Sequence, residues 1–321
     1  MKKLVALLLV LVAGLAVGIW FIQGWSGAGP ARQPTSVVIA PGTSMVAAAN
    51  QLEKAGVIAS AERFLFQAKL FGGGEPIKAG EYEIPARASH AQILSLLQSA
   101  RTLQRMVTVP EGLPSILVHE RLMKAPALTG EVAVPEEGSI LPNSYSYQRG
   151  EPRSEVVKRM QAAMKRTLAE LWPRRSAATV VKTPAEAVTL ASIVEKETGK
   201  ASERRMIAGV YSNRIRQGMK LDADPTVIYP ITKGRPLGRR ILRSELNANN
   251  GYNTYAMAGL PVGPIANPGK ESIAAVLNPA QTQALYFVAD GTGGHVFANT
   301  LAEHNANVQK WFAIRRARGE M

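Results

Sequence analysis

An uncharged run near the amino terminus sets the strongest limit on how this chain folds. Met1-Lys2-Lys3 precedes nineteen residues without a charge, from Leu4 to Ile22, and about 20 apolar residues suffice for a helix to cross a bilayer. Lysines before such a run place its start in the cytoplasm, and Trp20 and Trp25 suit the far interface. We therefore expect a cytoplasmic tip and a transmembrane anchor over residues 1–25.

A cleaved signal peptide is the alternative, because Ser26 to Gly29 are small residues of the kind found at cleavage sites. The apolar run is longer than the usual apolar region of about 7–15 residues, which favours an uncleaved anchor. A Gly/Ser/Pro-rich linker follows over residues 26–34. We expect the chain beyond it to lie in the periplasm, attached to the inner membrane by a single pass.

Composition limits the class of partner. The chain has no cysteine, so it can form neither disulfides nor thiolate metal sites. A net charge of +14 indicates an anionic partner. Nucleic acid is not expected, because the chain is exported and its basic residues are scattered rather than interleaved with aromatic ones. An acidic cell wall or membrane surface fits better.

The chain divides into a small unit over residues 35–101 and a larger one over residues 102–321, and the fold class is α+β. In the small unit we expect the order strand, two helices, strand, helix, over residues 35–39, 43–52, 61–71, 80–85 and 89–99. In the larger unit we expect strands over residues 102–110, 285–289 and 295–297, with helices over 115–123, 154–171, 184–198, 202–218, 271–277 and 301–318. Residues 136–147, 221–229 and 259–269 are rich in turn formers and are expected to be loops.

The helix over residues 184–198 carries carboxylates at the end of an apolar segment. Thr183 and Glu186 have the spacing of a capping box. At about 100° per residue, Glu197 lies on the apolar stripe of this helix, whereas Glu195 points away from it. Burial raises the pKa of a carboxyl group, so Glu197 is a candidate general acid and Glu195 a supporting or surface charge. Alternatively, the helix ends in solvent and both are surface charges.

Other chemistries lack their motifs. The nucleophile elbow Gly-x-Ser-x-Gly does not occur, the four histidines have no metal-ligand spacing, and no glycine-rich phosphate loop precedes a helix. We expect no metal and no cofactor, and we interpret His295 and His304 as structural. Carboxylates remain, which points to cleavage of glycosidic bonds. Asp222 and Asp224 either supply a second carboxylate or cap the turn before Pro225.

A resemblance to a known family rests on many blocks in order. They are 191–198 (ASIVEKET), 201–204 (ASER), 213–215 (NRI), 218–221 (GMKL), 224–229 (DPTVIY), 252–255 (YNTY), 259–261 (GLP), 264–265 (PI) and 286–291 (YFVADG), with 80–82 (GEY) and 110–112 (PEG) upstream. Together these blocks resemble the YceG-like (MltG) family of endolytic murein transglycosylases. The resemblance covers nearly the whole exported region.

The resemblance implies a single-pass inner-membrane enzyme with a LysM-like subdomain over residues 35–101 and a mixed α+β catalytic domain over residues 102–321. Such enzymes cut nascent peptidoglycan strands between N-acetylmuramic acid and N-acetylglucosamine, leaving 1,6-anhydromuramoyl ends, and are linked to ending strand synthesis. Peptidoglycan synthases are therefore candidate partners. The family's catalytic glutamate aligns with Glu197, and Glu195 is the fallback.

One glutamate suffices for the lytic reaction, because the C6 hydroxyl of muramic acid, rather than water, attacks C1. By residue type, the candidate sugar contacts are Asn213, Asp224, Tyr252, Asn253 and Tyr255, although the tyrosines could equally be core residues. Where the family shows an Asp, in a Phe-Pro-Asp-Thr-Tyr-like motif, this chain has Asn143, which leaves no charge there. Two alternatives remain open: a non-catalytic peptidoglycan-binding scaffold of a division or elongation complex, and a water-using glycoside hydrolase that pairs Glu197 with Asp222 or Asp224.

Overall fold

The computed structural model describes residues 12, 14, 18, 24–99 and 101–320. Almost all of the predicted anchor, residues 4–22, therefore lies outside the described residues. In the part of the chain that is described, no helix combines the length and the apolar character needed to cross a membrane. The described chain forms two compact units: the first runs to Arg105 and also includes Ser146–Gly150, and the second contains the rest.

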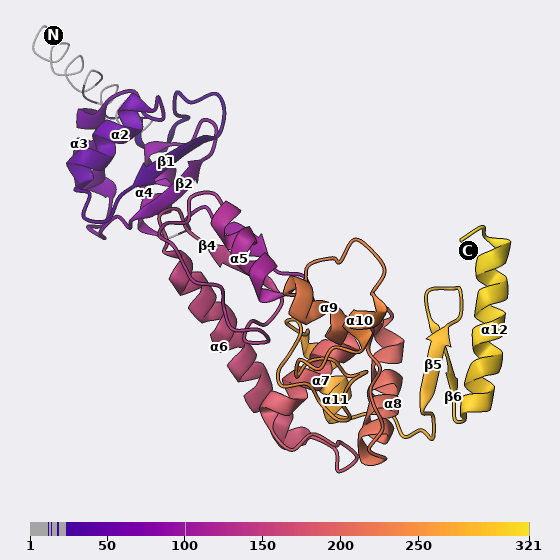
Figure 1. Cartoon of the computed structure of the whole chain (residues 1–321). Helices are drawn as coiled ribbons and strands as arrows, with labels where there is room; N and C mark the ends of the chain where they lie inside the picture. The colour runs from indigo at the N-terminus through magenta and orange to yellow at the C-terminus, as the bar shows by residue number, and fades with distance from the viewer. Residues whose placement is uncertain (1–11, 13, 15–17, 19–23, 100, 321) are drawn as a thin grey trace, which may run out of the picture. The chain divides into compact units, whose positions relative to one another are not determined.

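The first unit is a two-stranded sheet with three helices (Figure 1). Its elements are β1 (Thr35–Ile39), α2 (Met45–Lys54), α3 (Ala61–Phe71), β2 (Gly80–Ile84) and α4 (His90–Gln98). β1 and β2 are antiparallel, with Thr35 opposite Ile84 and Ile39 opposite Gly80. The structure confirms the predicted element order, because alternating apolar residues in the strands and serine caps before the helices are local signals.

Three serines mark the helix starts of this unit. The side chains of Ser44, Ser60 and Ser89 each accept a hydrogen bond from a backbone N–H of the first turn. The core beneath the sheet includes Phe64 and Tyr82, both fully buried. The Tyr82 hydroxyl donates to backbone carbonyls at 2.7 and 3.2 Å, which satisfies the polar end of a buried ring.

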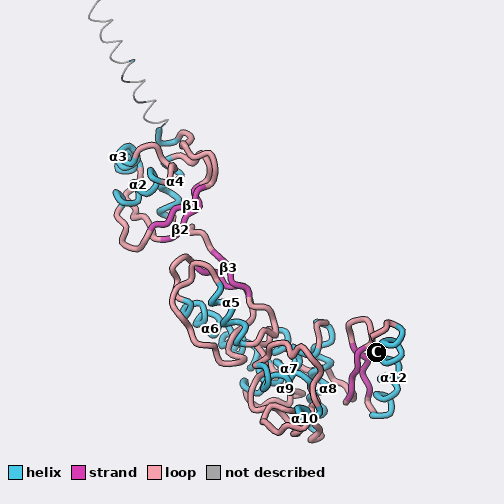
Figure 2. The backbone as a smooth tube through the Cα atoms, turned by 45° about the horizontal axis from the view of Figure 1, so that its top comes forward, coloured by secondary structure: helices cyan, strands magenta, loops and turns pink. Residues whose placement is uncertain are grey.

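The second unit consists mostly of helices and loops, and its strands form short pairs (Figure 2). Its first elements are β3 (Arg105–Thr108), α5 (Ser115–Lys124), β4 (Ser144–Tyr147), α6 (Arg153–Leu171), a 3₁₀ turn (Trp172–Arg174), α7 (Pro184–Glu197), a second 3₁₀ turn (Ala201–Glu203) and α8 (Arg204–Arg216). The others are α9 (Asp224–Thr232), α10 (Arg243–Leu246), α11 (Lys270–Leu277), β5 (Tyr286–Ala289), β6 (His295–Ala298) and α12 (Leu301–Ala317). β3 pairs with β4, and β5 pairs with β6 in antiparallel register.

Two segments predicted as loops contain regular structure. Ser144–Tyr147 forms strand β4, because pairing with β3 supplies partners that a turn-rich sequence alone does not reveal. Asp224–Thr232 forms helix α9, which begins with Asp224 and Pro225 in its first turn. An acidic residue and a proline are both favourable in a first helical turn, so the Asp-Pro pair marks a helix start rather than a turn.

Helix α7 lies at the centre of the second unit, where it packs against α8, α9 and α11 (Figure 1). Thr183 caps it, as its spacing predicts, and accepts from the Glu186 N–H at 3.1 Å. All eight residues from Ala187 to Val194 are buried. The expected apolar stripe is therefore too narrow a description of this helix: its middle is enclosed on every side, and its charged residues lie only in the first and last turns.

Candidate active site

Glu197 is the last residue of α7, and its side chain lines a cavity of about 440 Å³. Burial is the main cause that raises the pKa of the Glu197 carboxyl, and the nearby charge of Asp224 raises it further. A hydrogen bond from the Tyr211 hydroxyl and the positive charge of Arg214 act in the opposite direction. The resulting pKa is about 7, so this carboxyl holds a proton in half of the molecules near neutral pH.

The cavity is built from several parts of the second unit. Besides Glu197, its walls are Tyr211, Arg214, Leu221, Asp222, Asp224, Tyr255, Tyr286, Phe287, Leu301 and His304. They come from α8, the segment before α9, the start of α9, the loop around residue 255, strand β5 and helix α12. Three carboxyl groups, an arginine and hydroxyl groups facing a cavity of this size suit a polar ligand such as a sugar.

Helix α8 supplies two cavity residues that sequence reasoning did not assign a role, Tyr211 and Arg214. Tyr211 is buried, and its ring packs edge-on against Phe287 with 5.8 Å between the centroids. Because both residues lie three apart on one helix face, their spacing could have indicated a shared surface.

Arg214 is held rigidly by the backbone. Its Nε donates to the Leu285 carbonyl and its Nη1 to the Leu221 carbonyl, each at 2.7 Å. Its guanidinium lies 3.7 Å from Asp222 and over the Tyr286 ring. These contacts place a permanent positive charge in the cavity wall near Glu197.

Two predicted sugar contacts, Asp224 and Tyr255, meet in this cavity. The Tyr255 hydroxyl donates to Asp224 Oδ1 at 2.7 Å, and burial together with this bond raises the pKa of Tyr255. The segments that carry Asp224 and Tyr255 are also joined in the interior, where Thr226 Oγ1 and Thr254 Oγ1 lie 2.9 Å apart. The bond between Tyr255 and Asp224 thus brings residues 31 positions apart in the chain to one wall of the cavity.

The side chains of the other three predicted sugar contacts bond to backbone carbonyls or pack against the core. Asn253 is fully buried, and its amide nitrogen donates to the carbonyls of Glu245, Leu246 and Ala248, so direct contact with a sugar is wrong for this residue. The Asn213 amide donates to two carbonyls of the segment before β5, and Asn213 does not line the cavity.

Tyr252 also lies outside the cavity lining. Its ring is 5.0 Å from that of Tyr229 and packs against the core of the second unit, which is the core role left open for the tyrosines. Asn213 thus binds the segment before β5, and Tyr252 packs against the core, so neither side chain lines the cavity. Residue type alone could not distinguish a polar side chain that braces a loop from one that faces the cavity.

Glu195 is a paired charge rather than a surface charge. Its side chain is 5% exposed, its Oε1 lies 3.2 Å from Arg204 Nη2, and its Oε2 accepts from the Gly269 N–H at 2.9 Å. Arg204 also pairs with Glu111 at 2.8 Å. A carboxylate engaged in this way holds neighbouring segments together, so the geometry favours Glu197 over Glu195 as the acid.

Histidines contribute packing to the site. His304 stacks on Tyr286 with 5.2 Å between ring centroids, and burial lowers its pKa, so it is neutral near neutral pH. Across residues 24–99 and 101–320, no three acidic or histidine side chains gather in a way that could hold a metal ion.

Comparisons with known proteins relate the chain to bacterial cell-wall enzymes. The profile of the YceG-like family matches residues 37–310. A protein of Bacillus subtilis (strain 168) named endolytic murein transglycosylase is 28% identical over 94% of this chain and 92% of its own length. A protein of the same name from Streptococcus pneumoniae serotype 2 is 27% identical over 86% of this chain, which spans only 58% of that relative.

A solved structure is also similar. A yceG-like protein from Listeria monocytogenes matches 85% of this chain and 98% of its own chain with a TM-score of 0.53 and 27% sequence identity.

Proposed function

Because the chain belongs to the YceG-like family, we propose that it is an endolytic transglycosylase of peptidoglycan with Glu197 as its catalytic acid and base. The observation that carries this proposal is the carboxyl of Glu197, which lines a polar cavity and has a pKa of about 7. A group with this pKa can give up a proton and take one back near neutral pH.

The reaction needs one such group. Protonated Glu197 gives its proton to the glycosidic oxygen as the bond from C1 of N-acetylmuramic acid to that oxygen breaks. The carboxylate then removes the proton from the C6 hydroxyl of the same sugar, whose oxygen bonds to C1. The products are an N-acetylglucosamine end with a free hydroxyl and a 1,6-anhydromuramoyl end, and Glu197 is protonated again. Attack from within the same sugar has the advantage of proximity.

The surrounding groups prepare Glu197 for both steps. Burial disfavours its charged form, which keeps the proton available for the leaving oxygen. The Tyr211 hydroxyl stabilises the carboxylate after the proton has left. Asp224, held by Tyr255, adds a negative charge to the same cavity, where positive charge develops on the sugar ring as the bond breaks.

A water-using glycoside hydrolase is the second candidate, because Asp224 and Asp222 share the cavity with Glu197. In that reaction one of these aspartates would activate water or attack C1. A non-catalytic peptidoglycan-binding scaffold is the third. A scaffold has no use for a carboxyl beside a cavity whose pKa is raised to about 7, so the state of Glu197 favours an enzyme.

We further propose that the run from Leu4 to Ile22 anchors the protein in the inner membrane as a single pass, with both units in the periplasm. The first unit would act as the LysM-like domain and bind the wall. Anchoring in the inner membrane would place Glu197 near peptidoglycan strands as they leave the membrane, so peptidoglycan synthases are the expected partners.

Product analysis tests the proposal. Purified peptidoglycan strands are incubated with the protein, and the new ends are identified by mass spectrometry. Anhydro ends are expected; reducing ends would establish the hydrolase, and uncut strands the scaffold. Glu197→Gln should abolish cleavage with the fold intact. Cleavage that survives in Glu197→Gln and disappears in Glu195→Gln would transfer the catalytic role to Glu195.

A further inference from the structure

Glu197 borders a second cavity, of about 430 Å³, in addition to the one described above. Thr198 and Gly199, which follow Glu197, line it on one side. The turn between β5 and β6 and the side chain of Trp311 line it on the other. The candidate acid therefore stands where two cavities meet.

The same strand and the same helix run along both cavities. In β5, Phe287 lines the first cavity and Ala289 the second. In α12, His304 lines the first and Trp311 the second. Seven helical residues span about 10 Å. The two cavities therefore adjoin at Glu197 and are lined by the same strand and the same helix.

We propose that the second cavity is a saccharide subsite, which binds sugars of the strand on the side of the cut bond opposite to those in the first cavity. This inference rests on the proposed function, since an enzyme that cuts within a strand must hold sugar on both sides of the bond. Trp311 is the residue that would stack on a sugar ring there.

The surroundings of Trp311 support this role. Its side chain is partly buried and is not among the residues that form or flank the described core of the second unit. The Arg315 guanidinium lies 6.0 Å from the centre of its ring. A large aromatic ring that lines a cavity outside the core offers a flat apolar face with polar groups near it, and this combination suits the apolar faces of sugar rings.

The turn between β5 and β6, on the same side of the cavity as Trp311, is rich in glycine. The turn includes Gly291 and Gly293, which have φ angles of +81° and +89°, and Gly294 follows. Positive φ angles let the turn fold tightly, and Asp290 Oδ1 closes it by accepting from the backbone N–H groups of Thr292 and Gly294 at 2.6 and 3.1 Å. Arg318 steadies the turn from α12, since its Nη2 donates to the Gly291 carbonyl at 2.6 Å.

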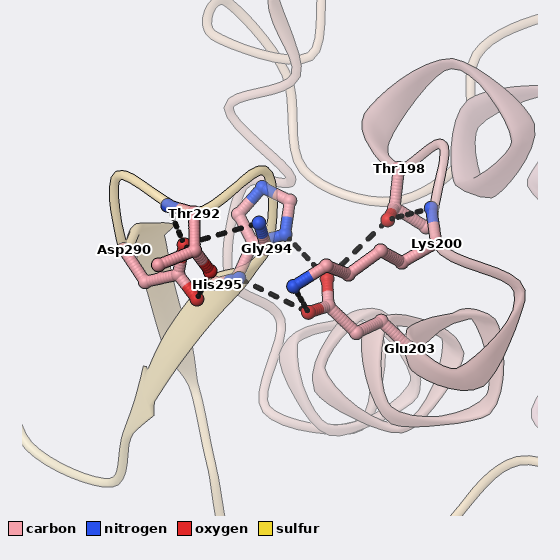
Figure 3. Close-up of polar contacts among 7 residues, drawn as sticks. All are labelled: Thr198, Lys200, Glu203, Asp290, Thr292, Gly294 and His295. Carbon is pink, nitrogen blue, oxygen red and sulfur yellow. Dashed lines mark hydrogen bonds and ion pairs between the residues drawn. The ribbon is translucent and has the colours of Figure 1, made fainter.

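Figure 3 shows how the turn is attached to Glu203 and, through it, to Thr198, the residue after Glu197. Glu203 accepts the backbone N–H of His295 at 3.1 Å, and its other oxygen lies 2.8 Å from His295 Nδ1 and 3.3 Å from the Thr198 hydroxyl. A side chain on Gly294 would collide with Lys200 and Glu203. These bonds fix the turn to the residues that follow Glu197, so the second cavity has a defined width.

Binding of peptidoglycan strands of graded length tests the subsite. The full-length Glu197→Gln chain, which should not cut its ligand, serves as the parent, and affinity is measured by calorimetry. Adding Trp311→Ala should weaken binding of strands long enough to fill both cavities by about tenfold, equivalent to about 1.4 kcal/mol. Strands short enough for one cavity should bind as they do to the parent, and Trp311→Phe should restore most of the affinity for long strands.

Phe312→Ala is the matched control, because it removes an aromatic ring from the next position of the same helix and lines neither cavity. Unchanged affinity for long strands in Trp311→Ala would overturn the subsite, and so would an equal loss for short and long strands. Failure of the proposed function appears separately, as an absence of anhydro ends from the unmodified chain. A chain that binds long strands through Trp311 without cutting them would retain the subsite and refute the lytic activity.

Discussion

Replacing Glu197 by glutamine should stabilise the protein at alkaline pH while abolishing its activity. The pKa of this carboxyl is raised from 4.5 to about 7 in the folded state. Between these values the native state binds more protons than the unfolded state, so stability falls as the pH rises through this window. Each pKa unit corresponds to about 1.4 kcal/mol, which gives a cost of about 3 kcal/mol above pH 7. Glutamine cannot ionise, and its carbonyl can still accept from Tyr211.

Urea unfolding of both proteins at about pH 4 and about pH 8 measures this effect on the transition of the second unit. At the lower pH the carboxyl is protonated in both states, and the two proteins should be equally stable. At the higher pH Glu197→Gln should be more stable by up to about 3 kcal/mol.

Glu195→Gln is the matched control, with the same change two residues away. It weakens the contacts to Arg204 and Gly269, so it should destabilise the protein at about pH 8 by about 2 kcal/mol. If Glu197→Gln is also destabilised at the higher pH, then Glu197 is not held in a desolvating environment, and the reasoning that makes it the acid fails.

Three further expectations follow from the same contacts. Because Glu197 must be protonated to begin the reaction, kcat/KM should fall about tenfold per pH unit above a pH of about 7, and a profile flat to pH 9 would contradict this. Tyr211→Phe removes the hydrogen bond that lowers the pKa of Glu197, so the alkaline limb of that profile should move to higher pH; a shift to lower pH would show that the Tyr211 hydroxyl does not stabilise the carboxylate. In the first unit, Arg105 holds the pKa of Glu81 at about 2, so this carboxylate stabilises the fold above pH 4.5 and loses its effect as the pH falls toward 2. Glu81→Gln should therefore lower the urea stability of that unit by about 3 kcal/mol at neutral pH and leave it nearly unchanged near pH 2.

Local signals in the sequence were sufficient for most elements. The serine and threonine caps, the two-residue period of β1 and β2, and the 3.6-residue period of the long helices each depend on neighbours only a few positions away. The family blocks likewise pointed to Glu197 as the candidate acid. By contrast, β4 was missed because it exists only through its pairing with β3.

Tertiary structure decided which polar residues face the cavity. Asn253 and Tyr255 are two positions apart, and both residue types can bind a sugar. The Asn253 amide, however, donates to three backbone carbonyls, whereas the Tyr255 hydroxyl donates to Asp224 in the cavity. Glu195 and Glu197 also differ. Arg204 pairs directly with Glu195, whereas burial raises the pKa of Glu197 by more than Tyr211 and Arg214 lower it. Desolvation and pairing depend on residues distant in the sequence, as with Glu203 and His295, which lie 92 positions apart. The sequence alone determined where the carboxylates stand along the chain, and only the packing around them decided which one can carry a proton.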